Sequence, residues 1–185
     1  TGLVGEEILK VLQEKKIKIN DLTLVASNKS IGKTVEFCNN NYKIISIEDA
    51  LEKKLDVAIF SAGKDLSLKW ANKFANNEVT VIDNSSAWRM DKTKKLIVPE
   101  VNGNELTIGD KIIANPNCST AQLVIVLKSL NDNFKIKRIV ISTYQSTSGA
   151  GKKPMDELID QTKSILNNKS FEVKNFTKQI AFNAI

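Results

Sequence analysis

Residues 111–127 read KIIANPNCSTAQLVIVL, and this stretch decides the fold. Its apolar start, 111–114, predicts a strand, and its apolar end, 121–127, predicts a helix. The Asn, Pro, Ser and Thr residues between them favour a turn that starts a helix. Cys118 is therefore expected at a helix N-terminus, where unpaired backbone N–H groups and partial positive charge favour a thiolate. On this stretch alone, a reactive cysteine and a small buried structural cysteine both remain open.

The same alternation of strand-like and helix-like segments runs through the whole chain and predicts an α/β fold. Strands are expected at residues 22–26, 57–60, 79–82, 96–98, 111–114 and 137–144. Helices are expected at residues 3–14, 47–53, 65–76, 119–131 and 153–167. Short, almost continuously apolar strands favour a parallel sheet that is covered on both faces. A domain boundary is expected near Cys118, after the long loop 99–110.

Composition narrows the class of protein. The chain has 185 residues, 42% hydrophobic and 26% charged, which is enough for one domain or parts of two. Its net charge of +6 comes from scattered lysines, which favours attraction for small anions over nucleic acid binding. Two cysteines and no histidine argue against a disulfide framework and against a metal site. Without a signal peptide or a long apolar run, a soluble protein of the reducing cytoplasm is expected, with no membrane partner.

Two short segments predict a dinucleotide cofactor. Gly2 and Gly5 lead directly into a helical pattern, as in the glycine turn that places a pyrophosphate on a helix N-terminus, although a simple helix cap is the alternative. The strand that should precede this turn is not in the sequence. About twenty residues further on, residues 26–30 contain no acid for the ribose hydroxyls of NAD. Lys29 and Ser30 suit the 2′-phosphate of NADP instead, with a solvated turn as the alternative.

Three further segments offer candidate ligand contacts. Ser61 and Gly63 follow the strand at 57–60, at the sheet edge where open α/β folds bind ligands. Arg89 is one of very few arginines, and its planar fork suits phosphate or carboxylate, with a surface ion pair as the alternative. The small residues of the loop 145–151 allow backbone to approach a cofactor, and Gln145 is expected to face the same cleft as Cys118. A flexible connection is the alternative for this loop.

Together, these segments resemble the bacterial aspartate-semialdehyde dehydrogenases. The resemblance rests on residues 1–5, 83–89, 98–102, 115–120 and 142–151 and extends along the whole chain. The NPNCST motif combined with YQxxSG is specific, whereas the glycine turn is shared with many dehydrogenases. The resemblance implies a Rossmann-type NADP-binding domain at 1–117, followed by the first part of an α+β catalytic and dimerisation domain at 118–185.

The resemblance also implies a reaction and a site. The reaction would interconvert L-aspartate 4-semialdehyde and 4-phospho-L-aspartate, an early step toward diaminopimelate, lysine, threonine and methionine. Cys118 would form an acyl-thioester, Gln145 would orient the substrate, Arg89 would bind phosphate and Asn117 would position the thiol. The cofactor contacts would be Thr1, Gly2, Leu3, Val4, Lys29, Ser30, Ser61, Gly63, Ser148 and Gly149. A homodimer is implied, with a homotetramer as the alternative.

One departure from the family is plain. The family uses a histidine as acid/base in the second half of the catalytic domain, and this sequence has no histidine. The chain is therefore expected to be truncated at both ends, and the 185-residue piece alone is expected to show little or no turnover. Two alternatives remain: a related N-acyl-glutamyl-phosphate reductase, and a non-catalytic NADP-binding module.

Overall fold

The computed structural model describes residues 2–185, so Thr1, a predicted cofactor contact, lies outside the described residues. The chain forms two compact units, which divide after Ile136. We call them the N-terminal unit and the C-terminal unit, and each is described by itself.

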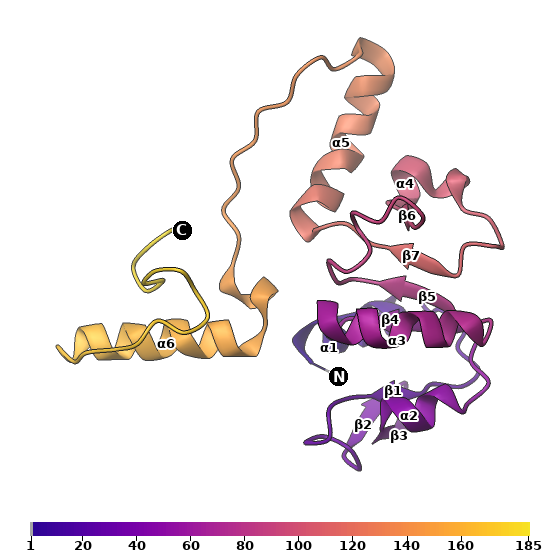
Figure 1. Cartoon of the computed structure of the whole chain (residues 1–185), viewed down its shortest axis with the longest axis horizontal. Coiled ribbons are helices and arrows are strands. Elements are labelled where there is room, and N and C mark those ends of the chain that lie inside the picture. The colour runs from indigo at the N-terminus through magenta and orange to yellow at the C-terminus, as the bar shows by residue number, and fades with distance from the viewer. Residues whose placement is uncertain (1) are drawn as a thin grey trace. The chain divides into compact units, whose positions relative to one another are not determined.

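A four-stranded parallel sheet forms the centre of the N-terminal unit (Figure 1). Its strands are β4 (Val57–Phe60), β5 (Thr80–Asp83), β7 (Ile112–Ala114) and β6 (Lys95–Leu96), in this spatial order. The parallel sheet predicted from the apolar runs is confirmed, and each of these strands lies within two residues of its predicted bounds.

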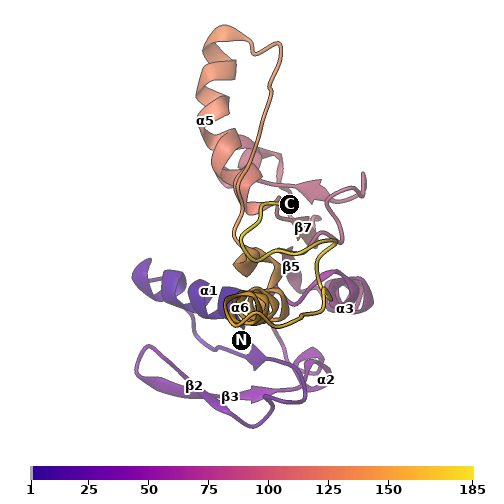
Figure 2. The same cartoon turned by 90° about the vertical axis from the view of Figure 1, so that its left-hand side faces the viewer.

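One face of this sheet is covered by helix α3 (Lys64–Asn76) (Figures 1 and 2). The helix buries Trp70, Ala71 and Phe74, and the rings of Phe60 and Phe74 meet edge to face at 5.5 Å. Each large apolar side chain buried here contributes about 1.5–3 kcal/mol to folding. The core of the unit therefore lies between α3 and the sheet.

The other face of the sheet is more open. Along β4, side chains alternate between the two faces, and Val57 and Ile59 point away from the core with 51% and 42% of their surface exposed. At the edge strand β4 this face is therefore not covered as predicted, whereas Ile82 of β5 and Ile113 of β7 are half-buried. No described helix buries this side of β4.

A second, three-stranded sheet has the order β1 (Leu24–Val25), β3 (Asn40–Ile45), β2 (Thr34–Phe37). Strands β2 and β3 form an antiparallel hairpin that the sequence patterns did not predict. Its two-residue turn is Cys38–Asn39, with φ of 49° and 62°, which is the conformation of a mirror-image hairpin turn. The hairpin was missed because its turn carries no glycine.

All five predicted helices are present, within three residues of their expected bounds. They are α1 (Leu3–Glu14), α2 (Ile47–Leu51), α3, α5 (Cys118–Phe134) and α6 (Lys152–Leu166). The expected loop 99–110 also contains the short helix α4 (Pro99–Asn102) and a 3₁₀ turn, η1 (Gly103–Glu105). Helix α5 extends away from the sheet, and none of its 17 residues is buried (Figures 1 and 2).

The C-terminal unit corrects one prediction. Residues 137–144 were expected to form a strand, but the chain there is irregular, with Val140 79% and Tyr144 94% exposed. A strand requires a hydrogen-bonded neighbour, and no described segment pairs with these residues. A 3₁₀ turn, η2 (Thr147–Ala150), and α6 follow.

Two side chains of α6 hold the irregular segment that follows the helix. The Glu157 carboxylate accepts hydrogen bonds from the backbone N–H groups of Lys174 and Asn175, at 2.9 and 2.6 Å. Gln161 Oε1 accepts from the N–H groups of Ile180 and Ala181. Burial opposes ionisation of Glu157, but the hydrogen bonds that its carboxylate accepts from Lys174, Asn175 and Gln161 outweigh burial. They hold the pKa of the carboxyl below its ordinary value.

Across residues 2–185, no helix combines the length and apolar character that crossing a membrane requires.

Candidate functional site

Cys118 is the first residue of α5, reached from the end of β7 by the turn 115–117. Its side chain is exposed. Asn117 caps the helix, because its Oδ1 accepts from the Ser119 N–H at 3.1 Å and from the Ser119 hydroxyl at 2.6 Å. The Cys118 Sγ lies 3.9 Å from the same oxygen. The predicted helix-terminal position of the thiol is confirmed, and the structural alternative of a buried cysteine is excluded.

Arg89 connects two strand ends. Its Nε donates to the carbonyl of Asn115 and its Nη2 to the carbonyl of Asn84, both at 2.9 Å. These bonds use two of the five N–H donors of the guanidinium. The side chain is half-buried, unlike a typical solvated surface arginine. The structure therefore brings Arg89 to the turn that precedes Cys118, and its role as a phosphate contact stays a prediction.

Asn84 and Asn115 lie beside Arg89, and although both belong to motifs that the sequence analysis used, neither was predicted as a site residue. The Nδ2 of Asn115 donates to the Oδ1 of Asn84 at 2.6 Å, and the Asn115 N–H donates to the carbonyl of Asp83 at 2.8 Å. Each asparagine directly follows a strand of the parallel sheet. Polar residues at adjacent strand ends were the signal that could have identified them.

A buried network holds the loop that carries Arg89. Asp83 is fully buried, and its carboxylate accepts from the hydroxyl of Ser67 and, at 2.5 Å, from the N–H of Ser85. The indole of Trp88 donates to the same Ser67 hydroxyl at 2.8 Å. These hydrogen bonds anchor both ends of the loop 83–88 to the core. The buried network therefore holds Arg89, the next residue, in place.

The predicted cofactor residues of the N-terminal unit lie at helix starts and strand ends. Gly2, Leu3 and Val4 are exposed at the start of α1, where Gly2 is the N-cap and no side chain caps the helix. Lys29 and Ser30 lie in the turn after β1.

Two further predicted cofactor residues, Ser61 and Gly63, follow β4. Ser61 is exposed, and Gly63 caps α3 with φ of 93°, a conformation that favours glycine.

The remaining predicted residues belong to the C-terminal unit. Gln145 is exposed, and Ser148 and Gly149 lie in η2, which Ser146 caps through a bond from the Ser148 N–H. The approach of Gln145 to Cys118 and the cofactor contacts of Ser148 and Gly149 stay predictions.

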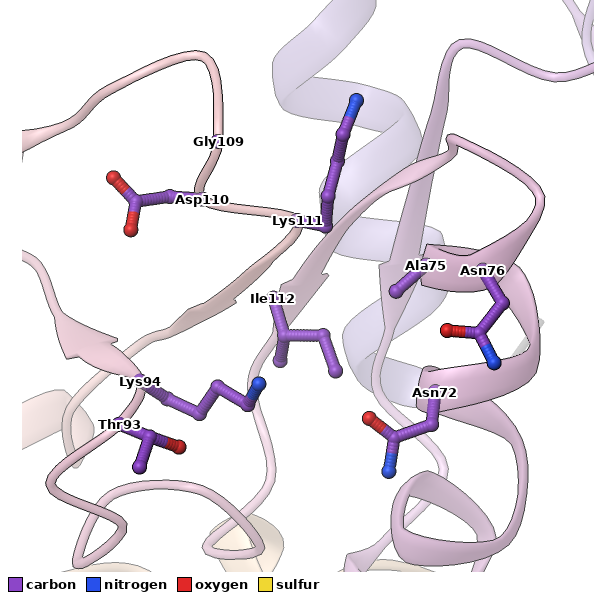
Figure 3. Close-up of a pocket in the computed structure, with 9 residues that line it drawn as sticks. All are labelled: Asn72, Ala75, Asn76, Thr93, Lys94, Gly109, Asp110, Lys111 and Ile112. Atoms are coloured by element: carbon purple, nitrogen blue, oxygen red, sulfur yellow. The ribbon is translucent and has the colours of Figure 1, made fainter.

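A separate cavity of about 210 Å³ lies near the start of β7 and the end of α3 (Figure 3). Asn72, Lys94 and Lys111 are among its lining residues. Cys118 follows the opposite end of β7, so this cavity is not part of the candidate site. In the described part of the chain, no group of three or more His, Cys, Asp or Glu side chains is placed to hold a metal ion.

Comparison with known families identifies the chain. Residues 1–108 match the family model described as semialdehyde dehydrogenase, NAD binding domain, and residues 127–185 match semialdehyde dehydrogenase, dimerisation domain. The chain belongs to the semialdehyde dehydrogenase family. Cys118 lies between the two matched regions. The predicted boundary at 117/118 also lies there, and it stays a prediction.

Relatives within the semialdehyde dehydrogenase family confirm the resemblance seen in the motifs. Aspartate-semialdehyde dehydrogenase of Aquifex aeolicus is 48% identical over the whole chain, which covers 56% of that protein. The protein of that name from Rickettsia bellii is also 48% identical, with 99% of this chain and 55% of its own length covered.

A solved structure shows the same relation. The aspartate semialdehyde dehydrogenase II of Vibrio cholerae, complexed with ASA, is 45% identical with a TM-score of 0.90. The match covers 99% of this chain and 55% of that one. The chain therefore spans about half the length of the relatives it matches.

Proposed function

We propose that the whole protein interconverts L-aspartate 4-semialdehyde and 4-phospho-L-aspartate through a thioester on Cys118. The observation that carries the proposal is the exposed thiol at the first residue of α5, with Arg89 bonded to the turn before it. The relatives named aspartate-semialdehyde dehydrogenase support the choice of substrate over an N-acyl-glutamyl phosphate.

In the biosynthetic direction, the sulfur of Cys118 attacks the acyl carbon of 4-phospho-L-aspartate. The new S–C bond replaces the bond from carbon to the phosphate oxygen, and phosphate leaves with that electron pair. The sulfur lies at the start of α5, the positive end of the helix dipole. Asn117 holds the first turn of the helix, and therefore the direction in which the sulfur points.

Arg89 is the proposed phosphate contact. Two of its N–H groups hold the strand ends, and the other three are not used by those bonds. A guanidinium in a fixed plane can stabilise the charge on the departing phosphate without reorganising. Gln145 is the proposed contact that orients the amino acid part of the substrate.

The described residues fit a nicotinamide dinucleotide. The uncapped, exposed start of α1 leaves backbone N–H groups for a pyrophosphate, and the conformation of Gly63 allows close approach of backbone at the end of β4. We propose NADP as the cofactor, because Lys29 and Ser30 follow β1 where NAD enzymes carry an acid. When bound, NADPH would supply the hydride that reduces the thioester. Thr1, Ser61, Ser148 and Gly149 are further proposed contacts.

The setting of the reaction is also a proposal. The match to a dimerisation domain supports an oligomer, for which we propose a homodimer. We place the enzyme in the cytoplasm, in the route to diaminopimelate, lysine, threonine and methionine. The family resemblance implies an acid/base histidine, and since this chain has none we expect the 185-residue piece to turn over poorly.

The decisive experiment captures the thioester. The whole protein is incubated with 4-phospho-L-aspartate in the absence of NADPH, and the Cys118 peptide is examined by mass spectrometry. We expect the mass of an aspartyl group on Cys118, and none in Cys118→Ser. Acylation elsewhere, or oxidation of the semialdehyde by Cys118→Ser at the native rate, would contradict the proposal.

Cofactor preference tests the role of Lys29. Replacing it with Ala is expected to raise the KM for NADPH about tenfold and leave the KM for NADH unchanged, since one charge-assisted contact to the 2′-phosphate is lost. Lys18→Ala, which removes an exposed lysine elsewhere, is the matched control. Equal effects on both cofactors would refute NADP discrimination by Lys29.

A further inference from the structure

We propose that Asn84 and Asn115 form a positioning pair, which sets the guanidinium of Arg89 and the thiol turn of Cys118 relative to each other. The catalytic role of this pair rests on the proposed function. Neither asparagine is placed in contact with substrate or cofactor. They act through the two residues whose positions they control.

The pair extends the sheet by one residue. Asp83 and Ala114 are the last paired residues of β5 and β7, and the Asn115 N–H still donates to Asp83 at 2.8 Å. The register of β5 and β7 ends there, and the next contact between the two chains is the hydrogen bond of 2.6 Å between the side chains of Asn84 and Asn115. Both side chains are half-buried, where a hydrogen bond is stronger than in water.

Arg89 depends on this bond. Its two acceptors are the backbone carbonyls of the same two residues, at 2.9 Å each. Two acceptors fix both the position and the plane of a guanidinium, provided that the distance between them stays constant. If the side-chain bond breaks and the strand ends separate, Arg89 can keep only one of the two carbonyls.

The thiol is tied to the same point. Three peptide steps separate Asn115 from Cys118, so their Cα atoms are at most about 11 Å apart. The intervening Pro116 is buried and restricts the backbone, and Asn117 is held as the cap of α5. A shift at Asn115 therefore reaches Cys118 with little loss.

The direction of the hydrogen bond between the two side-chain amides provides a test of the positioning pair. Asn84 accepts and Asn115 donates, so Asn84→Asp keeps the acceptor, whereas Asn115→Asp removes the donor, and either two oxygens then face each other or the Asn84 amide must turn over. The two variants add the same charge at sites within 2.6 Å. A nonspecific electrostatic effect would therefore be similar in both.

The readout is the ratio of alkylation rates by iodoacetate and iodoacetamide, measured on the Cys118 peptide of the whole protein. The anionic reagent reports the positive field of Arg89 at the thiol, and a general loss of stability would not change the ratio. We expect Asn115→Asp to lower the ratio about three- to tenfold, the value of one hydrogen bond, and Asn84→Asp to keep it within twofold. Equal losses in both variants, or no change in either, would overturn the proposal.

A double-mutant cycle gives a second test that does not depend on charge. Asn84→Ala, Asn115→Ala and the double variant should lower the same ratio equally, because either single change already breaks the pair. Additive losses would show two independent roles. Thermal unfolding identifies any variant that fails to fold, and in that case the two Asp variants decide.

Failure of this proposal and failure of the proposed function can be told apart. Alkylation needs neither substrate nor cofactor, so the ratio tests the pair even if the protein acts on another acyl phosphate. In steady-state assays of the reverse reaction, Asn115→Asp should raise the KM for phosphate and leave that for NADP unchanged. An unchanged KM for phosphate would refute the link from the pair through Arg89.

Discussion

The two cysteines of this chain lie in turns of similar composition but different architecture. Cys38 and Cys118 are both exposed, and each is next to an asparagine. Cys38 lies at the tip of the β2–β3 hairpin, with Asn39 also at positive φ, whereas Cys118 begins a 17-residue helix that Asn117 caps. The hairpin turn offers no array of aligned N–H groups. The element that follows a cysteine, rather than its exposure or its neighbours, distinguishes the two thiols.

The strongest way to break this comparison is to remove each thiol in turn from the whole protein. Cys118→Ser should lower kcat at least about 10³-fold, because serine is a far weaker nucleophile in the acyl step. The kcat of Cys38→Ser should stay within twofold of the native value. Both are measured as phosphate-dependent reduction of NADP by the semialdehyde. A large loss in Cys38→Ser would mean that the hairpin takes part in the reaction.

The next test compares the two thiols in one molecule. At pH 6.5, iodoacetamide should alkylate Cys118 about tenfold faster than Cys38, because Cys118 lies at a helix N-terminus whereas Cys38 lies in a hairpin turn. Peptide mass spectrometry follows both sites in the same sample, so each thiol is the control for the other. Equal rates would remove the physical basis for choosing Cys118.

Matched asparagine substitutions sharpen the comparison further. Asn117→Ala removes a helix cap and should cost about 1 kcal/mol of unfolding free energy. Asn39→Ala should cost a similar amount for another reason, since alanine is disfavoured at its φ of 62°. Urea unfolding measures both costs. Only Asn117→Ala should slow alkylation of Cys118, about two- to fivefold, because only this variant loosens the helix start.

The smallest effect is expected from the far end of β7. Asp110 accepts hydrogen bonds from Lys95 and Thr107, which lower its pKa from 3.8 to about 2. The stabilisation is present above pH 4 and is lost as pH falls from about 4 to about 2, because the unfolded carboxyl takes up its proton first. Asp110→Asn should thus be less stable than the native protein at pH 7, and the difference should shrink toward pH 2.

Urea unfolding at several pH values measures this effect, and the alkylation ratio of Cys118 to Cys38 is recorded alongside. We expect that ratio to be unchanged in Asp110→Asn. A changed ratio would show that the reactivity of Cys118 depends on the whole of β7. The local turn alone would then not explain the difference between the two thiols.

Apolar periodicity predicted the strands of the central parallel sheet and the helices because each of these elements shows its period within its own residues. The run 57–60 and the helix 3–14 have the predicted bounds. The hairpin at Cys38 was not predicted, since positive φ at cysteine is uncommon and leaves no reliable mark in the sequence. The strand expected at 137–144 has the right residue types, but these types cannot supply a hydrogen-bonding partner.

By itself, the sequence determined the α/β class, the helix start at Cys118 and the motifs that led to the semialdehyde dehydrogenase family. These features depend on the order of residues within short stretches of the chain, because apolar periodicity and helix capping both act over a few residues. Only the tertiary structure decided that Arg89 bonds to Asn84 and Asn115 at once. Residues 26 positions apart meet there because parallel strands end at one edge of the sheet, and that geometry cannot be read from spacing along the chain.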